Sequence, residues 1–327
     1  MKLFVYGIRE YDELPYFEQL ARGYGLTFGY TTEYPSMENV HLAAGYPAIS
    51  IITNRMDAAL VDAFYGAGVR HIATRSVGTD HIDLDHAREI GMHVSHVNYP
   101  PETVADYAIM LILMSLRKIT YILDRARLQD FSLQGKLGRD LCDCTVGVIG
   151  TGQIGRAVIC HLAGFGCRLY AYDPYPDEEL SEIVTYTDFE TLLGTCDVIT
   201  LHAPATKENF HLLDKDAFSI MRPGAVIVNT ARGILIDTKA LITALEDGRV
   251  GAAALDVLED ENGLYFLNRM GDCLANPQMA LLRSFPNVIL SPHTAFYTEK
   301  VVWVMAEQTV RCICDCVYGV DNPLVLF

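Results

Sequence analysis

The sequence has no apolar run long enough to cross a bilayer; its longest one, residues 107–116, follows closely on Asp106. Its N-terminus shows no signal-peptide cleavage pattern. Basic residues are few, since 25 Lys and Arg stand against 41 Asp and Glu, and the formal net charge is −16. This excess of negative charge argues against binding to nucleic acid or to an anionic membrane. An anionic ligand must therefore be held by locally placed cations and amides.

The sequence also has no CxxC motif among its nine cysteines. Because their number is odd, they cannot all pair in disulfides within the chain. Cys312, Cys314 and Cys316 are two residues apart within a predicted helix, so their side chains cannot converge on one metal ion. We expect free thiols in a reducing cytoplasm, and no metal site.

The chain is long enough for two domains, with 327 residues of which 50% are hydrophobic and 20% charged. Short β-rich apolar runs alternate with helical patterns, which predicts mostly parallel sheets. Strands are predicted over residues 3–6, 48–52, 71–75, 93–97, 198–202, 226–229, 252–257 and 288–291. After Pro100 and Pro101 a long helix is predicted from about Glu102 to Leu128.

Two clusters of βαβ type predict an α/β protein with two doubly wound parallel-sheet domains, of Rossmann or flavodoxin-like type. We expect one domain, residues 101–296, to be inserted into the other, made of residues 1–100 and 297–327. The inserted domain contains the glycine-rich stretch 145–155 analysed below, which makes it the dinucleotide-binding domain and the other the catalytic, substrate-binding domain. The crossovers then fall near Pro100 and Phe296. A discontinuous arrangement of this kind favours a ligand site at the hinge.

The most informative motif is residues 145–155, TVGVIGTGQIG, which predicts a buried strand, a glycine turn and a helix. Gly150 permits the tight turn, Gly152 lets the backbone approach a pyrophosphate, and Gly155 lets helix and strand pack closely. Asp173 ends the next strand about 20 residues on, where a carboxylate can accept the ribose hydroxyls. No Lys or Arg stands beside Asp173 to receive a 2′-phosphate, so NAD is favoured over NADP.

Three polar residues follow predicted parallel strands at their C-terminal ends, the edge where α/β sheets bind ligands. Arg232 can hold a carboxylate bidentately, and His293 can give or take a proton at the C2 oxygen of a 2-oxo acid. Glu261, placed next to His293, favours the imidazolium form. Taken singly, a strand-end Arg is more often a surface ion pair and a His after Pro more often structural. Together with a nicotinamide that supplies the hydride, the set predicts oxidoreductase chemistry.

The whole chain resembles the D-2-hydroxyacid dehydrogenase family, in its D-lactate dehydrogenase branch. The matching stretches are RSVGTDHID (75–83), VADY (104–107), TVGVIGTGQIG (145–155), NTARG (229–233), ALDV (254–257) and SPHTAFYT (291–298). The resemblance implies that Arg232, Glu261 and His293 are the catalytic residues. It implies an NAD-dependent, reversible reduction of a small 2-oxo acid, first of all pyruvate, to the (R)-2-hydroxy acid, D-lactate.

The resemblance also implies binding residues beyond the glycine turn and Asp173. For the cofactor these are Gln153, Ile154, Ala203, Pro204, Asn209, Thr230, Ala231 and Asp256, with alanine at 203 where the family has valine. For the substrate, besides Arg232 and His293, they are Val77 and Gly78, whose amides cradle the carboxylate, and Tyr99 and Phe296, which line the pocket. Ordinary core packing is the alternative for Tyr99 and Phe296.

Two other functions stay open at this point. A related enzyme could act on bulkier acids such as 2-oxoisocaproate or phenylpyruvate, and residues 262–272, just after Glu261, leave that size preference undecided. The same scaffold can also serve as an NAD-sensing corepressor. The family further implies a homodimer, and the apolar residues on nearly all sides of the predicted helix around Ile109–Leu116 fit such burial.

Overall fold

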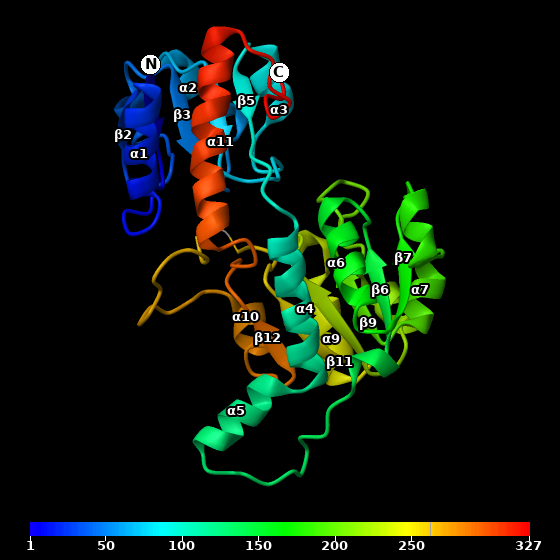
Figure 1. Ribbon diagram of the computed structural model, residues 1–327. Coiled ribbons are helices and arrows are strands. Elements are labelled where there is room, and N and C mark those ends of the chain that lie inside the picture. The colour runs from blue at the N-terminus through cyan, green and yellow to red at the C-terminus, as the bar shows by residue number, and fades with distance from the viewer. Residues whose placement is uncertain (262) are drawn as a thin grey trace. The chain divides into compact units, whose positions relative to one another are not determined.

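The computed structural model describes residues 1–261 and 263–327, and the chain divides into two compact units (Figure 1). One unit comprises Met1–Pro100 and Tyr297–Phe327, and the other comprises Pro101–Phe296. Each unit has its own parallel sheet with helices packed on it. The predicted fold class, two parallel-sheet α/β domains, is confirmed.

The first unit contains a five-stranded parallel sheet in the order β2-β1-β3-β4-β5. Its elements are β1 (Lys2–Val5), α1 (Leu14–Tyr24), β2 (Thr27–Tyr30), η1 (Val40–Ala43), β3 (Ala48–Ile51), α2 (Ala58–Gly66), β4 (His71–Thr74), α3 (Leu84–Glu89), β5 (His93–Ser95) and α11 (Glu299–Tyr318). The sequence pattern missed β2, because this edge strand buries none of its residues and so lacks an apolar run.

The second unit contains a seven-stranded parallel sheet in the order β12-β11-β10-β9-β6-β7-β8. The strands are β6 (Thr145–Ile149), β7 (Arg168–Tyr172), β8 (Thr185–Tyr186), β9 (Val198–Leu201), β10 (Ala225–Asn229), β11 (Val250–Leu255) and β12 (Val288–Leu290). The strand order reverses at β6, between β7 and β9, and such a switch point opens a crevice at the carboxyl ends of the strands. All eight predicted strands are present, with ends within two residues of the predicted ones.

Helices cover both faces of this second sheet. They are α4 (Glu102–Leu116), α5 (Ile119–Arg127), α6 (Gln153–Ala163), α7 (Phe189–Thr195), α8 (Lys215–Ile220), α9 (Thr238–Glu246) and α10 (Pro277–Leu282), with short turns η2 (Leu141–Asp143), η3 (Glu178–Glu182) and η4 (Gly233–Leu235). Among the described helices of both units, none is long and apolar enough to span a membrane.

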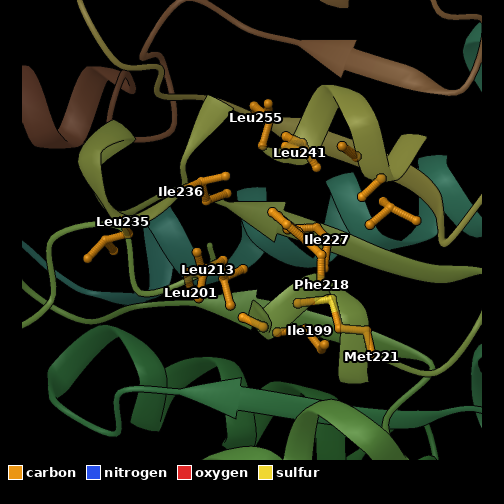
Figure 2. Close-up of a cluster of buried hydrophobic side chains, with 14 of the residues drawn as sticks. Ile199, Leu201, Leu213, Phe218, Met221, Ile227, Leu235, Ile236, Leu241 and Leu255 are labelled. Carbon is orange, nitrogen blue, oxygen red and sulfur yellow. The ribbon is translucent and has the colours of Figure 1, made fainter. Parts of the chain in front are cut away.

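Alternate residues of each central strand face opposite cores. In β10, Ile227 packs with Leu201, Phe218 and Leu241 in the cluster shown in Figure 2. Its neighbours Val226 and Val228 instead join the second cluster, which α4 and α6 cover. Each fully buried side chain of this size contributes about 1.5–3 kcal/mol. Burial on both faces of the sheet fixes the positions of the strand ends, from which the loops described below extend.

The single long helix predicted from Glu102 to Leu128 is wrong. Helix α4 ends at Leu116, Lys118 takes a left-handed conformation with φ 53°, and α5 follows. The backbone amide of Arg139 donates to the Leu116 carbonyl oxygen at 3.0 Å, so a returning loop occupies the end of α4. Neither glycine nor proline marks this break in the sequence, which is why the apolar pattern did not predict it.

Candidate active site

The glycine turn between β6 and α6 leaves open space in front of the α6 N-terminus. A Cβ on Gly152, the N-cap residue, would have no heavy atom within 4 Å. A Cβ on Gly155 would lie 1.9 Å from the Gly150 carbonyl oxygen, and Gly150 itself has φ 91°. Gln153 and Ile154 form the first turn of α6, and neither is fully buried. Free space at a positively polarised helix end fits a pyrophosphate.

Asp173 lies just after β7 and is tied to this turn. Its Oδ2 accepts hydrogen bonds from the amide of Thr151 at 2.7 Å and from the Thr151 hydroxyl at 3.1 Å. Its Oδ1 accepts a hydrogen bond from the amide of Tyr175 at 2.9 Å. Arg156, on α6, pairs with two acids, Asp177 and Glu179. A carboxylate placed here suits ribose hydroxyls and repels a 2′-phosphate.

The loop after β9 holds three predicted cofactor residues. Ala203 is partly buried and Pro204 is exposed. The side-chain amide of Asn209 donates to the Pro204 carbonyl oxygen at 3.1 Å, which closes the loop. The structure thus brings these three positions together beside the glycine turn, since a Cβ on Gly150 would lie 2.7 Å from the Ala203 amide nitrogen.

Asn229, the last residue of β10, shapes the turn that presents Arg232. Its Oδ1 accepts a hydrogen bond from the Ala231 amide at 2.9 Å, and its Nδ2 donates to the Arg232 carbonyl oxygen at 2.8 Å. The Thr230 hydroxyl within this turn is buried and has no hydrogen-bond partner among residues 1–261 and 263–327. An unsatisfied buried hydroxyl is costly, and a bound nicotinamide group could satisfy it. The residues present therefore fit the dinucleotide.

Gly233 brings the Arg232 turn against the loop that leads to Glu261. A Cβ on Gly233 would lie 2.1 Å from both the carbonyl carbon and oxygen of Leu258, and 2.5 Å from the amide nitrogen of Glu259. Only glycine permits this approach. The two loops, from β10 and β11, are thus packed backbone to backbone, which limits how far Arg232 and Glu261 can separate.

Glu261 and His293 form a direct pair. The His293 Nδ1 lies 2.6 Å from Glu261 Oε1, and Glu261 Oε2 accepts a hydrogen bond from the Leu258 amide at 3.0 Å. His293 has φ 54°, and its amide donates to the Asp256 carbonyl oxygen at 2.8 Å. Since Nδ1 is engaged by the carboxylate, Nε2 is the nitrogen available to a substrate. The pair has the arrangement of a supported acid–base catalyst.

Asp256 is fully buried and holds the turn that carries His293. Its Oδ1 accepts hydrogen bonds from the Ser291 hydroxyl at 2.6 Å and the Thr294 amide at 3.0 Å, and its Oδ2 accepts one from the Ala295 amide at 2.9 Å. The family resemblance gave Asp256 as a cofactor-binding residue. It did not reveal these hydrogen bonds, because their partners lie 35–39 positions away.

The predicted substrate residues are divided between the units. Phe296 belongs to the same unit as Arg232, Glu261 and His293, whereas Val77, Gly78 and Tyr99 belong to the other. Val77 and Gly78 follow β4, in a turn closed by the Ser76 hydroxyl, which donates to the Gly78 carbonyl oxygen at 2.7 Å. Among the described residues, no group of three or more His, Cys, Asp or Glu could hold a metal ion.

Sequence reasoning missed Phe266. Its ring centroid lies 5.6 Å from that of His293 and 6.3 Å from that of Phe296. It has φ 63°, a conformation rare for a residue other than glycine, and nothing in the local pattern signals it.

Comparisons with known proteins identify the family. The family model described as "D-isomer specific 2-hydroxyacid dehydrogenase, NAD binding domain" matches residues 109–295. An "Aromatic 2-oxoacid reductase" of Clostridium sporogenes is 38% identical and aligns with 95% of this chain and 94% of its own length. The "D-lactate dehydrogenase" of Escherichia coli strain K12 is 36% identical, with 99% of each chain aligned.

Solved structures give the same result. The apo structure of D-lactate dehydrogenase from Escherichia coli superimposes with a TM-score of 0.85 at 35% identity, covering 100% of both chains. D-2-hydroxyisocaproate dehydrogenase gives a TM-score of 0.88 at 34% identity, covering 100% of this chain and 99% of the other. The matches span both units and include the NAD-binding domain. The chain is therefore an NAD-dependent enzyme of the D-2-hydroxyacid dehydrogenase family.

Proposed function

We propose that this enzyme reversibly reduces a small 2-oxo acid, with pyruvate as its principal substrate, to the D-2-hydroxy acid at the expense of NADH. The observation that carries this proposal is the Glu261–His293 pair at 2.6 Å, on a loop next to the Arg232 turn and in the same unit as the glycine turn. The similarity to D-lactate dehydrogenase along the full chain supports pyruvate.

The proposed roles follow from the chemistry of each group. Arg232 binds the substrate carboxylate, because a guanidinium can donate two parallel hydrogen bonds to it. His293 donates a proton from Nε2 to the C2 oxygen during reduction and takes it back during oxidation. Glu261 holds His293 in orientation through its contact with Nδ1. Bound NADH supplies the hydride that reaches C2.

We propose that the cofactor is held by the glycine turn and by the loops that follow β9, β10 and β11. Gln153 and Ile154 contact the pyrophosphate, and Asp173 accepts the ribose hydroxyls. The adenosine lies against Ala203, Pro204 and Asn209, and the nicotinamide against Thr230, Ala231 and Asp256. Asp256 contributes by fixing the 291–295 turn. Val77, Gly78, Tyr99 and Phe296 stay predicted substrate-binding residues.

The test is a panel of 2-oxo acids assayed by NADH consumption, with the chirality of each product determined. We expect turnover of pyruvate to the D-product. A higher kcat/KM for phenylpyruvate would favour the second candidate, an aromatic 2-oxo acid reductase, for which the rings beside His293 provide a specific observation. No turnover of any acid, with tight NADH binding, would contradict both and favour an NAD-sensing binding protein.

We further propose that the protein is a cytoplasmic homodimer. Helix α5, every residue of which the structure describes, buries none of its side chains. The segment after it exposes large apolar side chains, with Leu133 and Leu137 both 86% exposed. Exposed apolar side chains gathered in one segment mark an interaction surface, and a second copy of the chain is the occupant proposed. Light scattering should give twice 36.3 kDa, and the double variant Leu133→Ser with Leu137→Ser should give a monomer; a monomeric parent protein would contradict this.

A further inference from the structure

We infer that Phe266 is a specificity-determining residue, whose ring forms with Phe296 an apolar wall beside the His293 imidazole that contacts the side chain of a bulky 2-oxo acid. The inference rests on the proposed function, since it takes His293 to be the proton donor. It adds a residue that neither the motifs nor the resemblance identified.

Three rings lie in mutual contact. The Phe266 and His293 centroids are 5.6 Å apart with planes at 40°, and the Phe296 and His293 centroids are 6.4 Å apart at 80°. Phe266 and Phe296 complete the triangle at 6.3 Å and 74°. These separations are those of aromatic rings in contact; the Phe266–His293 pair is tilted and the other two pairs are edge-to-face. Both phenyl rings therefore border the imidazole itself.

The position of the substrate follows from proton transfer. The C2 oxygen must lie within about 3 Å of His293 Nε2 during the reaction. The side chain on the neighbouring carbon then extends from a point a few ångströms from the imidazole. Rings centred about 6 Å from that imidazole are within reach of a side chain with several carbons. A methyl group, as in pyruvate, is too short to use this surface fully.

The chain holds Phe266 in place through its neighbour. Tyr265 is buried in the hydrophobic cluster of the second unit, and its amide donates to the Glu261 carbonyl oxygen at 3.2 Å. Phe266 itself is 40% exposed and adopts φ 63°. A left-handed conformation at a bulky residue costs free energy and persists only where its surroundings impose it. The strained turn therefore costs folding stability, and it keeps an aromatic ring partly open to solvent beside the proton donor.

The chemistry of this surface selects by size and polarity. Both rings are apolar, so a branched or aromatic side chain that packs against them is removed from water, and this stabilises the complex. A single methylene in an apolar pocket changes kcat/KM by about 10- to 200-fold. Loss of the Phe266 ring should therefore lower kcat/KM at least about tenfold for a 2-oxo acid with a phenyl side chain. For an acid with a methyl side chain the decrease should be far smaller.

The experiment compares kcat/KM for pyruvate, 2-oxoisocaproate and phenylpyruvate. We expect Phe266→Ala to lower the value for phenylpyruvate by about tenfold or more, mainly through KM, and the value for pyruvate by less than about threefold. Phe266→Tyr, which keeps the ring, should restore the parent ratio. Leu267→Ala, an exposed neighbour on the same turn, is the matched control and should leave the ratio unchanged.

Urea unfolding and NADH fluorescence titration show whether each variant folds and binds cofactor. If Phe266→Ala does not fold, Phe266→Leu provides the same comparison with a smaller change. An equal fall for all three acids, or an unchanged ratio, would overturn the inference while leaving the proposed function intact. A parent enzyme that reduces none of the acids would instead refute the proposed function.

Discussion

Glu13 and Arg75 form an ion pair that is closed to solvent, with Arg75 Nε 3.1 Å from Glu13 Oε1 and side-chain exposures of 0% and 1%. The guanidinium also donates to the Ser50 hydroxyl at 2.9 Å and to the carbonyl oxygens of Tyr6 and Gly7 at 3.0 and 3.1 Å. The pair therefore ties the end of β4 to the ends of β1 and β3. The predicted substrate turn, residues 76–78, begins at the next residue.

Breaking this pair should destabilise the protein strongly. Burial lowers the pKa of the Arg75 guanidinium, and the Glu13 carboxylate opposes that effect. Glu13→Gln leaves the buried cation uncompensated, so we expect a loss of about 3–5 kcal/mol in the free energy of unfolding, measured in urea. The double variant Glu13→Leu with Arg75→Met should recover part of it. The recovery is incomplete because Arg9 loses its own contact with Glu13 Oε1 at 3.2 Å and, among the described residues, keeps only Asp12 as an ion-pair partner. Asp62→Asn, which breaks an exposed pair with His86, is the control and should cost far less.

The glycine turn allows binding and folding effects to be separated. Gly152→Ala places a methyl group in open space, so the free energy of unfolding should change by less than about 0.5 kcal/mol. The methyl group would occupy pyrophosphate space, so the Kd for NADH should rise at least about tenfold, equivalent to about 1.4 kcal/mol. Gly155→Ala meets the Gly150 carbonyl oxygen at 1.9 Å and should instead cost about 1–3 kcal/mol of stability. Unchanged NADH affinity in Gly152→Ala would place the pyrophosphate elsewhere.

Arg232→Ala should abolish recognition of the substrate carboxylate. Two charge-assisted hydrogen bonds of about 1.5–3 kcal/mol each are lost, so kcat/KM for the 2-oxo acid should fall at least about 100-fold. Arg232→Lys keeps the charge without the bidentate geometry, so its kcat/KM should lie between those of the parent enzyme and Arg232→Ala. The Kd for NADH should stay within about threefold of the parent value. Arg283→Ala, which removes a positive charge at an exposed position, is the control. Near-normal activity in Arg232→Ala would show that Arg232 takes no part in the mechanism.

Glu261→Gln tests the support of His293. The amide keeps the size of the side chain and removes its negative charge, so the His293 imidazole loses its anionic partner at Nδ1. We expect kcat to fall by about 10- to 100-fold, within the range that acid–base catalysis contributes, with NADH affinity unchanged. Steady-state kinetics and NADH fluorescence give the two readings. Glu246→Gln, at the exposed end of α9, is the control, and equal kcat in both variants would argue against the pair.

His71 should make the stability of the first unit depend on pH. Burial, with a smaller effect of His93, lowers the pKa of His71 from 6.5 to about 4. Between these values the unfolded chain binds more protons than the folded one, so stability is complete above pH 6.5 and is lost as the pH falls towards 4. From pH 8 to pH 5 the loss should be about 2 kcal/mol.

The measurement is urea unfolding at several pH values. His71→Gln should reduce the loss of unfolding free energy between pH 8 and pH 5 by about 2 kcal/mol, whatever its effect on stability at pH 8. His41→Gln, at an exposed position, is the control for replacing a histidine by glutamine. Parallel slopes for His71→Gln and the parent protein would show that His71 is not buried in its neutral form.

The sequence by itself determined the features that depend on neighbouring residues or on repeated local patterns. Alternating strands and helices required parallel sheets, and the strand–glycine–helix order around Gly150 required an anion site at a helix end. Parallel strands all end at one edge, so Arg232 and His293 were expected near each other before any coordinates were known. The inference of parallel sheets is confirmed, because strand and helix patterns depend on neighbouring residues. The anion site and the meeting of Arg232 with His293 stay predictions.

Only the tertiary structure decided which distant groups meet. Glu13 and Arg75 are 62 positions apart, and Asp256 binds the turn of His293 across 35 or more. Lys118 and Phe266 take left-handed conformations without being glycine, because packing against the rest of the chain offsets the local cost. Local sequence preferences do not include such long-range packing. The break after α4 and the ring beside His293 are therefore seen only in the folded chain.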